Sequence, residues 1–167
     1  SISGSAGSET ILDSSGLNNH GTNNGAVFSP TMGLIGGDGG AFSFSPSQYI
    51  NINNVLDDMK NSGTGTFNLW VKPNQFAGDD IFLSFSQTAG GTSINMGITA
   101  NQIYANAGNG GYPSGDWTLR TGSGLLSVGE WAMITLVFDG TKANFYVNGV
   151  DVSITIVIFK KEGSDAY

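Results

Sequence analysis

The chain has 167 residues, a net charge of −7 and only 11% charged residues. Lys and Arg together number 6, too few to neutralise a phosphate backbone, so nucleic acid and anionic membranes are disfavoured as partners. Cysteine is absent, which excludes disulfides, thiolate metal sites and thiol nucleophiles. We expect a single domain over residues 1–167, and no apolar stretch approaches the roughly 20 residues of a membrane-spanning helix.

Short strands dominate the predicted elements. Residues 1–25 are mostly Ser, Gly, Asn and Thr, which predicts loop and turn. One short helix is expected at 55–61, because Asn54 can cap its start and Lys60 lies near its end. The expected strands are 26–29, 41–45, 49–52, 66–72, 81–85, 94–99, 102–105, 117–120, 131–138, 143–147 and 150–152.

The most informative stretch runs from residue 130 to residue 152. Two β-rich runs flank Asp139-Gly140, and Asn148-Gly149 then turns the chain into a third run. Asp-Gly and Asn-Gly tolerate the positive φ that tight hairpin turns need. The stretch is therefore an antiparallel meander, and it predicts an all-β protein.

Three segments in order carry a family resemblance. They are Asp-Ser-Ser-Gly-Leu-Asn-Asn-His-Gly-Thr at 13–22, Phe-Asn-Leu-Trp-Val-Lys-Pro at 67–73, and the meander with its Glu-Trp start and Tyr-Val-Asn-Gly end. Together they resemble the laminin-G-like members of the concanavalin A-like lectin/glucanase superfamily. The resemblance implies an all-β, two-sheet antiparallel jelly-roll sandwich, in which we expect Trp70 and Trp131 to anchor the core.

The C-terminal segment departs from that family pattern. Members continue into two further strands and an Asp-rich segment, whereas this chain runs through the apolar residues 154–159 and stops at Tyr167. Three explanations stay open. Residues 154–159 form a replacement strand, the chain belongs to a longer one, or a partner supplies the missing strand to an open sheet edge.

Catalytic equipment is missing from the sequence. Glycan hydrolases need two carboxylates about 5–5.5 Å apart for retention, usually on one strand. The chain has only Glu9, Glu130 and Glu162, which are far apart in sequence. His20 is the only histidine and lies in a turn, where bonding to the turn backbone is its expected role, and one histidine without cysteine cannot hold zinc. We therefore expect no enzymatic activity.

Calcium is the metal that these residue types favour, because it takes six to eight oxygen ligands from flexible loops. Asp13 in the first turn and Asp79 and Asp80 after the central strand are the candidate ligands. The competing expectation is that Asp13 accepts hydrogen bonds from its own turn and that Asp79 and Asp80 are ordinary hairpin residues.

A glycan-binding loop is the main binding hypothesis. Aromatic rings stack on the apolar faces of sugars, and amide or carboxylate groups bond the hydroxyls. The Gly-rich loop at 106–115 has both kinds of residue around it, which gives the candidate ligand-binding residues Tyr104, Asn109, Tyr112, Asp116 and Trp117. Tyr104 and Trp117 can equally be structural residues of a hairpin and a strand.

The expected function is non-catalytic recognition or adhesion. By family habit, the setting is extracellular, on a cell surface or on a virion, and the ligand is carbohydrate or protein. The alternative is a structural subunit of a fibre, pilus or capsid whose sheet edges are completed by neighbouring subunits. The uncharged β-branched run at 154–159 motivates that alternative, because such a run aggregates when it is left exposed.

Overall fold

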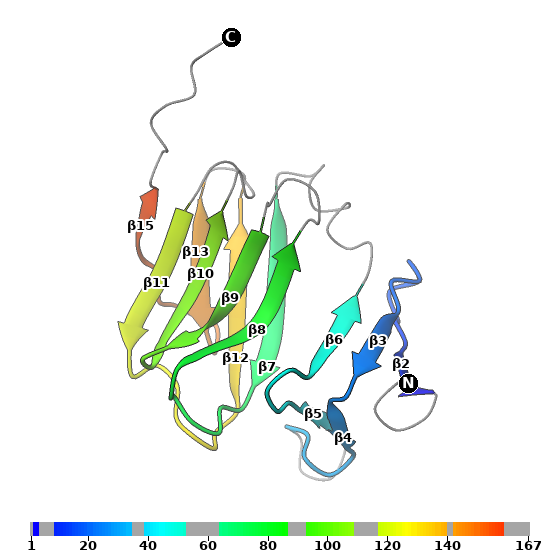
Figure 1. Cartoon of the computed structure of the whole chain (residues 1–167). Coiled ribbons are helices and arrows are strands. Elements are labelled where there is room, and N and C mark those ends of the chain that lie inside the picture. The colour runs from blue at the N-terminus through cyan, green and yellow to red at the C-terminus, as the bar shows by residue number, and fades with distance from the viewer. Residues whose placement is uncertain are drawn as a thin grey trace. The chain divides into compact units, whose positions relative to one another are not determined.

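The computed structural model describes residues 2–3, 9–34, 39–52, 64–86, 93–108, 117–139 and 142–158. The chain divides into two compact units, Ser1–Asp58 and Met59–Tyr167. All regular elements within the described residues are β-strands, which confirms the all-β class (Figure 1). The helix expected at 55–61 lies outside the described residues.

The first unit contains a four-stranded sheet and a separate hairpin. The sheet has the order β1-β2-β3-β6 and is antiparallel throughout. Its strands are β1 (Ile2–Ser3), β2 (Thr10–Ile11), β3 (Gly21–Asn24) and β6 (Tyr49–Ile52). The hairpin pairs β4 (Val27–Ser29) with β5 (Ala41–Ser43), and Phe28 and Phe42 lie opposite each other with ring centroids 5.2 Å apart.

The strands β2 and β3 lie in a region where the sequence predicted loop and turn, so that expectation was wrong. The sequence of β3, Gly-Thr-Asn-Asn, has little intrinsic preference for a strand. Its strand conformation comes from pairing with β6 and from the buried Asn23, whose amide donates to Glu9 and to the Ala26 carbonyl and accepts from the Ala26 N–H. Long-range pairing therefore overrides the local signal.

The second unit is a sandwich of two antiparallel sheets (Figure 1). The five-stranded sheet has the order β15-β11-β10-β9-β8 and the four-stranded sheet the order β14-β13-β12-β7. The strands are β7 (Gly65–Val71), β8 (Asp79–Ser86), β9 (Ser93–Thr99), β10 (Gln102–Gly108), β11 (Trp117–Ser123), β12 (Ala132–Phe138), β13 (Ala143–Val147), β14 (Val150–Asp151) and β15 (Ile154–Ile158).

The core of the sandwich comes from alternate residues of facing strands. On β12 and β13 the buried positions are Ala132, Ile134, Leu136, Phe138, Ala143, Phe145 and Val147; on β9, β10 and β11 they are Ile94, Met96, Ile98, Ile103, Ala105 and Leu119. The intervening residues face away from the core, because successive side chains of a strand point to opposite faces. This alternation fixes which side chains each sheet presents on its outer face.

The meander predicted at 130–152 is present as β12, β13 and β14. Asn148 and Gly149 have φ of 51° and 81°, as a tight hairpin turn with two left-handed residues requires. Residues Ile154–Ile158 form β15, which pairs with β11, so this segment is a strand, and all three explanations of the C-terminal departure stay open. Their strand lies at one edge of the five-stranded sheet.

Candidate functional site

The structure describes only part of the predicted glycan-binding loop. Asn109, Tyr112 and Asp116 lie outside the described residues. Tyr104 lies on β10 opposite Arg120, and Trp117 begins β11 opposite Ala107. Tyr104 and Trp117 therefore lie on neighbouring strands. The role of the loop as a ligand site stays a prediction.

Tyr104 is buried rather than exposed to solvent. It is 7% exposed, although its neighbours Ile103 and Ala105 turn toward the core and it must therefore point to the outer face. A Cβ atom placed on Gly97 would lie 3.0 Å from both Cε1 and Oη of Tyr104, so the ring lies against the glycine backbone. Burial, and then the negative charge of Asp79, raise the pKa of the Tyr104 hydroxyl, and Arg120 opposes this rise.

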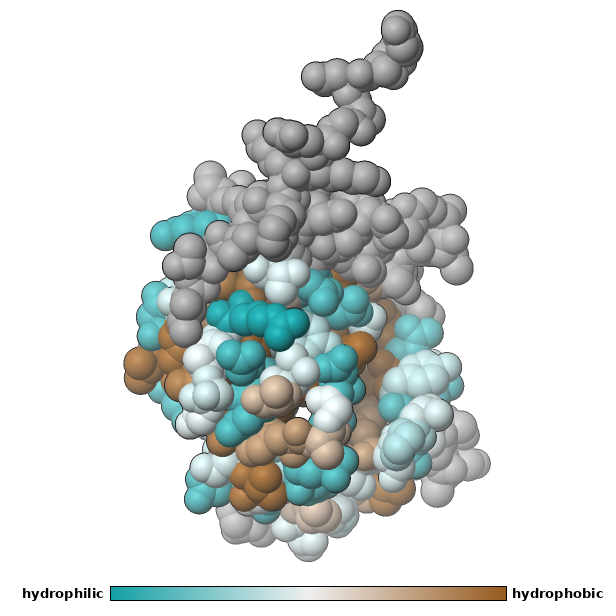
Figure 2. Space-filling model, turned by 60° about the vertical axis from the view of Figure 1, so that its left-hand side comes forward, coloured by the Kyte–Doolittle hydropathy of each residue, from teal (hydrophilic) through white to brown (hydrophobic). Residues whose placement is uncertain are grey.

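Polar side chains next to Tyr104 on the same face bond to one another. Ser84 Oγ donates to Asn95 Oδ1 over 2.7 Å, and Asn95 Nδ2 donates to Asn106 Oδ1 over 3.3 Å. Figure 2 views the molecule from the β11 side of this sheet, where hydrophilic and neutral residues dominate among the coloured residues. The side chains of Ser84, Asn95 and Asn106, which we call the Asn95 row, therefore use much of their hydrogen-bonding capacity within the protein.

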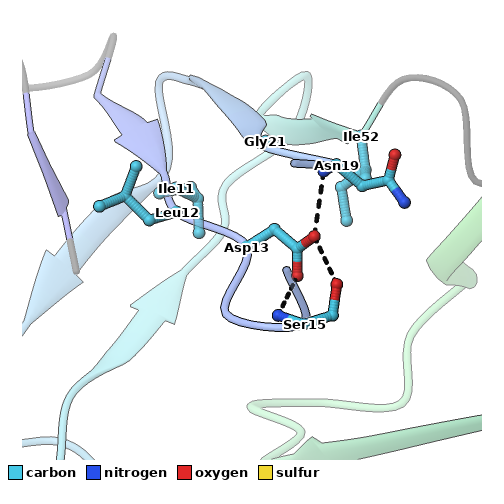
Figure 3. A pocket seen from close by; sticks show the side chains of 7 residues that line it. All are labelled: Ile11, Leu12, Asp13, Ser15, Asn19, Gly21 and Ile52. Carbon is cyan, nitrogen blue, oxygen red and sulfur yellow. Dashed lines mark hydrogen bonds between the residues drawn. The ribbon is translucent and has the colours of Figure 1, made fainter. Parts of the chain in front are cut away.

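The turn at Asp13 in the first unit also satisfies itself. Asp13 Oδ1 accepts the Ser15 N–H, and Oδ2 accepts the Ser15 hydroxyl and the Asn19 N–H (Figure 3). His20 Nδ1 accepts the Asp13 N–H over 3.0 Å, so His20 bonds to the turn backbone as expected. Beside the turn lies an open hollow of about 340 Å³, lined by Ile11, Leu12, Asp13, Ser15, Asn19, Gly21 and Ile52.

These hydrogen bonds predict a pH-dependent contribution of Asp13 to stability. The Ser15 hydroxyl, then the Ser15 and Asn19 N–H groups, lower the pKa of Asp13 below its ordinary value of 3.8. The ionised carboxylate therefore stabilises the folded state above pH 3.8, and this contribution is lost as the pH falls below 3.8 through the folded-state pKa.

We expect Asp13→Asn to melt at a lower temperature than the parent protein at neutral pH, because the amide cannot accept all three hydrogen bonds. The difference in melting temperature between Asp13→Asn and the parent should narrow as the pH falls below the ordinary pKa of aspartate. Thermal unfolding followed from pH 7 to about pH 2.5 measures it, since aspartate titrates near pH 3.9. Asp80→Asn, at an exposed carboxylate of β8, is the control, and equal melting temperatures of Asp13→Asn and parent at neutral pH would contradict the prediction.

The carboxylates predicted as calcium ligands do not assemble a site in the described part of the chain. No three His, Cys, Asp or Glu side chains come together there. Asp79 and Asp80 are both exposed and are consecutive on β8, so their side chains point to opposite faces. The carboxylate oxygens of Asp13 are engaged by its own turn. As arranged, these carboxylates do not fit a calcium ion. No function is therefore proposed through calcium, and calcium binding stays a prediction.

The outer face of the four-stranded sheet presents an exposed aromatic ring among polar side chains. Phe67, Leu69 and Val71 pack against the core, so Trp70 points outward, and it is 47% exposed. The expectation that Trp70 anchors the core was therefore wrong. Trp131, which precedes β12, is half-buried.

The strand register arranges this face in rows. Trp70 lies opposite Met133, and one row further Asn68, Thr135, Tyr146 and Asp151 lie side by side across β7, β12, β13 and β14. The third row holds Thr66, Val137 and Asn144. We call these outward residues the Trp70 face.

Several polar groups of the Trp70 face have hydrogen-bonding capacity to spare. Asn68 Nδ2 donates to Thr135 Oγ1 over 3.2 Å and contacts Met133 Sδ over 3.5 Å. Within the described residues, the Asn68 amide oxygen, the Asn144 amide and the Tyr146 hydroxyl have no protein partner. This distinguishes the Trp70 face from the Asp13 turn and from the Asn95 row, whose polar groups bond to each other.

Sequence reasoning missed the Trp70 face, although a signal was present. The run Phe67-Asn68-Leu69-Trp70-Val71 alternates, and the three apolar residues at 67, 69 and 71 assign Trp70 to the opposite face. Residue type alone assigns a tryptophan to the core, whereas its position in the alternation assigns Trp70 to the outer face.

Comparison with known families gave a match over most of the chain. The family model described as the concanavalin A-like lectin/glucanases superfamily, of laminin G type, matches residues 44–164. Laminin-G-like domains are typically non-catalytic binding domains, and the superfamily commonly binds carbohydrate or protein. No curated protein and no solved structure matched the chain. Within the described residues, no helix has the length and apolar character needed to cross a membrane.

Proposed function

The chain belongs to the concanavalin A-like lectin/glucanase superfamily, and we propose that it is a non-catalytic domain that recognises carbohydrate through the Trp70 face. The exposed Trp70 ring is the observation that carries the proposal. An aromatic ring turned to solvent, with amide and hydroxyl groups beside it, offers a sugar both a stacking surface and hydrogen-bond partners. We place this activity outside the cell, on a cell surface or on a virion.

The proposal explains why an apolar ring faces solvent on a strand whose other apolar residues pack against the core. A tryptophan at an exposed sheet position gains little for folding, whereas tryptophan is enriched among residues that dominate binding energy. The absence of a paired acid and base in the sequence agrees with binding without bond cleavage. Glu9 and Glu130 belong to different units, and Glu162 lies outside the described residues.

Screening the protein on a glycan array, followed by calorimetry on the best sugar, tests the proposal. We expect Trp70→Ala to weaken binding by about 30-fold or more, because hot-spot residues contribute about 2 kcal/mol or more. The melting temperature should change little, because the side chain leaves the core intact. Binding that persists unchanged in Trp70→Ala would overturn the proposed surface.

Trp117→Ala is the matched comparison, because it removes a tryptophan next to the predicted loop site. Loss of binding in Trp117→Ala but not in Trp70→Ala would assign recognition to the loop and its residues Tyr104, Asn109, Tyr112 and Asp116. Absence of binding to any sugar would overturn carbohydrate recognition altogether.

A second candidate function is assembly, and the edge position of β15 favours it. An uncharged strand at a sheet edge is a template for pairing with a neighbouring chain. Size-exclusion chromatography with light scattering separates the two functions. A monomer at high concentration supports recognition, whereas a ladder of oligomers supports a subunit of a fibre, pilus or capsid.

A further inference from the structure

We propose that the ligand of the Trp70 face is an extended carbohydrate chain that crosses the sheet obliquely from Trp70 to Tyr146, and not a single terminal sugar. This inference rests on the proposed function and specifies the form of the sugar. The rows of side chains described above carry it.

The first argument is distance. Trp70 is on β7 and Tyr146 is on β13, with β12 between them, and the two residues are one row apart. Strands lie about 4.8 Å apart and same-face residues of one strand about 6.7 Å apart, so the Cα atoms of Trp70 and Tyr146 are separated by about 12 Å. One sugar ring cannot stack on both side chains, whereas a chain of several sugars can.

The second argument is the chemistry between the two rings. Asn68 and Thr135 occupy the row of Tyr146 and lead from β7 toward it. The free amide oxygen of Asn68 and the hydroxyl of Tyr146 can each bond a sugar hydroxyl, because neither has a protein partner among the described residues. A ligand that spans the rings therefore meets polar partners along its course.

The third argument is access at both ends. In the four-stranded sheet, β7 and β14 are the edge strands within the described part of the chain. Trp70 lies on one edge strand and Tyr146 lies next to the other. Among the described residues of the second unit, no further strand of this sheet lies beyond either ring to stop a chain that extends past it, as binding within a polymer requires.

Calorimetry with cello-, xylo- and manno-oligosaccharides of increasing length, from one sugar to about six, tests the inference. We expect one series to show affinity that rises at least about tenfold with length and then levels, as a second aromatic contact is gained. Tyr146→Ala should abolish the gain with length and leave the affinity for the shortest ligands unchanged. Trp70→Ala should weaken binding at every length.

Two further variants keep the result interpretable. Tyr146→Phe retains the ring and should keep most of the length dependence, and Ile81→Ala removes an exposed apolar side chain of β8, in the five-stranded sheet, and should change nothing. Far-ultraviolet circular dichroism and melting temperatures establish that each variant is folded. If Tyr146→Ala does not fold, Tyr146→Thr takes its place, because threonine also removes the ring and is well suited to a strand.

The outcomes separate the two proposals. Equal affinity for one sugar and for six, with both weakened by Trp70→Ala, overturns the extended ligand and leaves the proposed function standing. A length dependence that Tyr146→Ala does not change overturns the path to Tyr146. Absence of binding to every sugar of the glycan array and to every oligosaccharide of the three series overturns the proposed function itself.

Discussion

Replacing Phe145 by alanine is expected to lower the free energy of unfolding of the sandwich by about 3–5 kcal/mol. Phe145 is 0% exposed, and it lies opposite Leu136, which is also fully buried. Truncation removes a large apolar surface from the core and leaves a cavity that the rigid strands on either side cannot fill. Denaturant unfolding, followed by fluorescence or circular dichroism, measures the loss.

The neighbouring residue supplies the control. Tyr146 has a ring of similar size but points to the outer face, so Tyr146→Ala should cost much less, about 1 kcal/mol. Similar losses for Phe145→Ala and Tyr146→Ala would contradict the assignment of the two faces of β13. The comparison also establishes that Tyr146→Ala is folded enough for binding studies.

Gly97→Ala is the second change with a large expected effect, about 1–3 kcal/mol of destabilisation, as overpacking typically costs. An added Cβ would overlap the backbone carbonyl oxygen of Asp80 and would lie 3.0 Å from the Tyr104 ring. A side chain can move aside, but the carbonyl belongs to the β8–β9 ladder and can move only with the strand. We therefore expect the upper part of the range.

A double-mutant cycle separates the two contacts. If the Asp80 carbonyl is the main obstacle, Tyr104→Ala will not restore the stability lost in Gly97→Ala. Full recovery in the double variant would show that the tyrosine ring alone sets the cost. Thermal unfolding of the parent, both single variants and the double variant gives the four values.

The meander could be predicted because its local signals agree. Alternation on β12 and β13 and the Asn148-Gly149 turn all indicate the same antiparallel pairing, and the structure has it. The sandwich class followed from the same agreement together with the family resemblance, and the family match at residues 44–164 confirms it.

The strands of the first unit could not be predicted in the same way. Gly21–Asn24 has no apolar alternation, and its pairing depends on Ile50 and Ile52, which lie far along the chain. Asn23 is 1% exposed, so a polar residue occupies a position where pattern reasoning expects an apolar one. Its three hydrogen bonds make that burial tolerable.

The kind of side chain proposed for binding could be predicted from the sequence, but its position in the fold could not. Sequence reasoning looked for an aromatic platform in the Gly-rich loop, because loops often carry function. The exposed ring on which the proposed function rests lies on a regular strand, at Trp70, and the loop stays a separate prediction. Which face of a strand meets ligand depends on which face meets the core, and that is decided by the second sheet rather than by the strand alone.

The alternation that turns Trp70, Asn68 and Tyr146 outward also assigns core packing and surface contact to different residues of the same strands. Inward residues hold the sheets together, and outward residues can be exchanged with little effect on that packing. Substitutions at 66, 68, 70, 144 and 146 would therefore change what this face presents to solvent with little effect on the core. A shift of pairing by one residue would instead bury the Trp70 face and expose Phe67 and Phe145 together. Outward residues can therefore change while the strand register stays fixed.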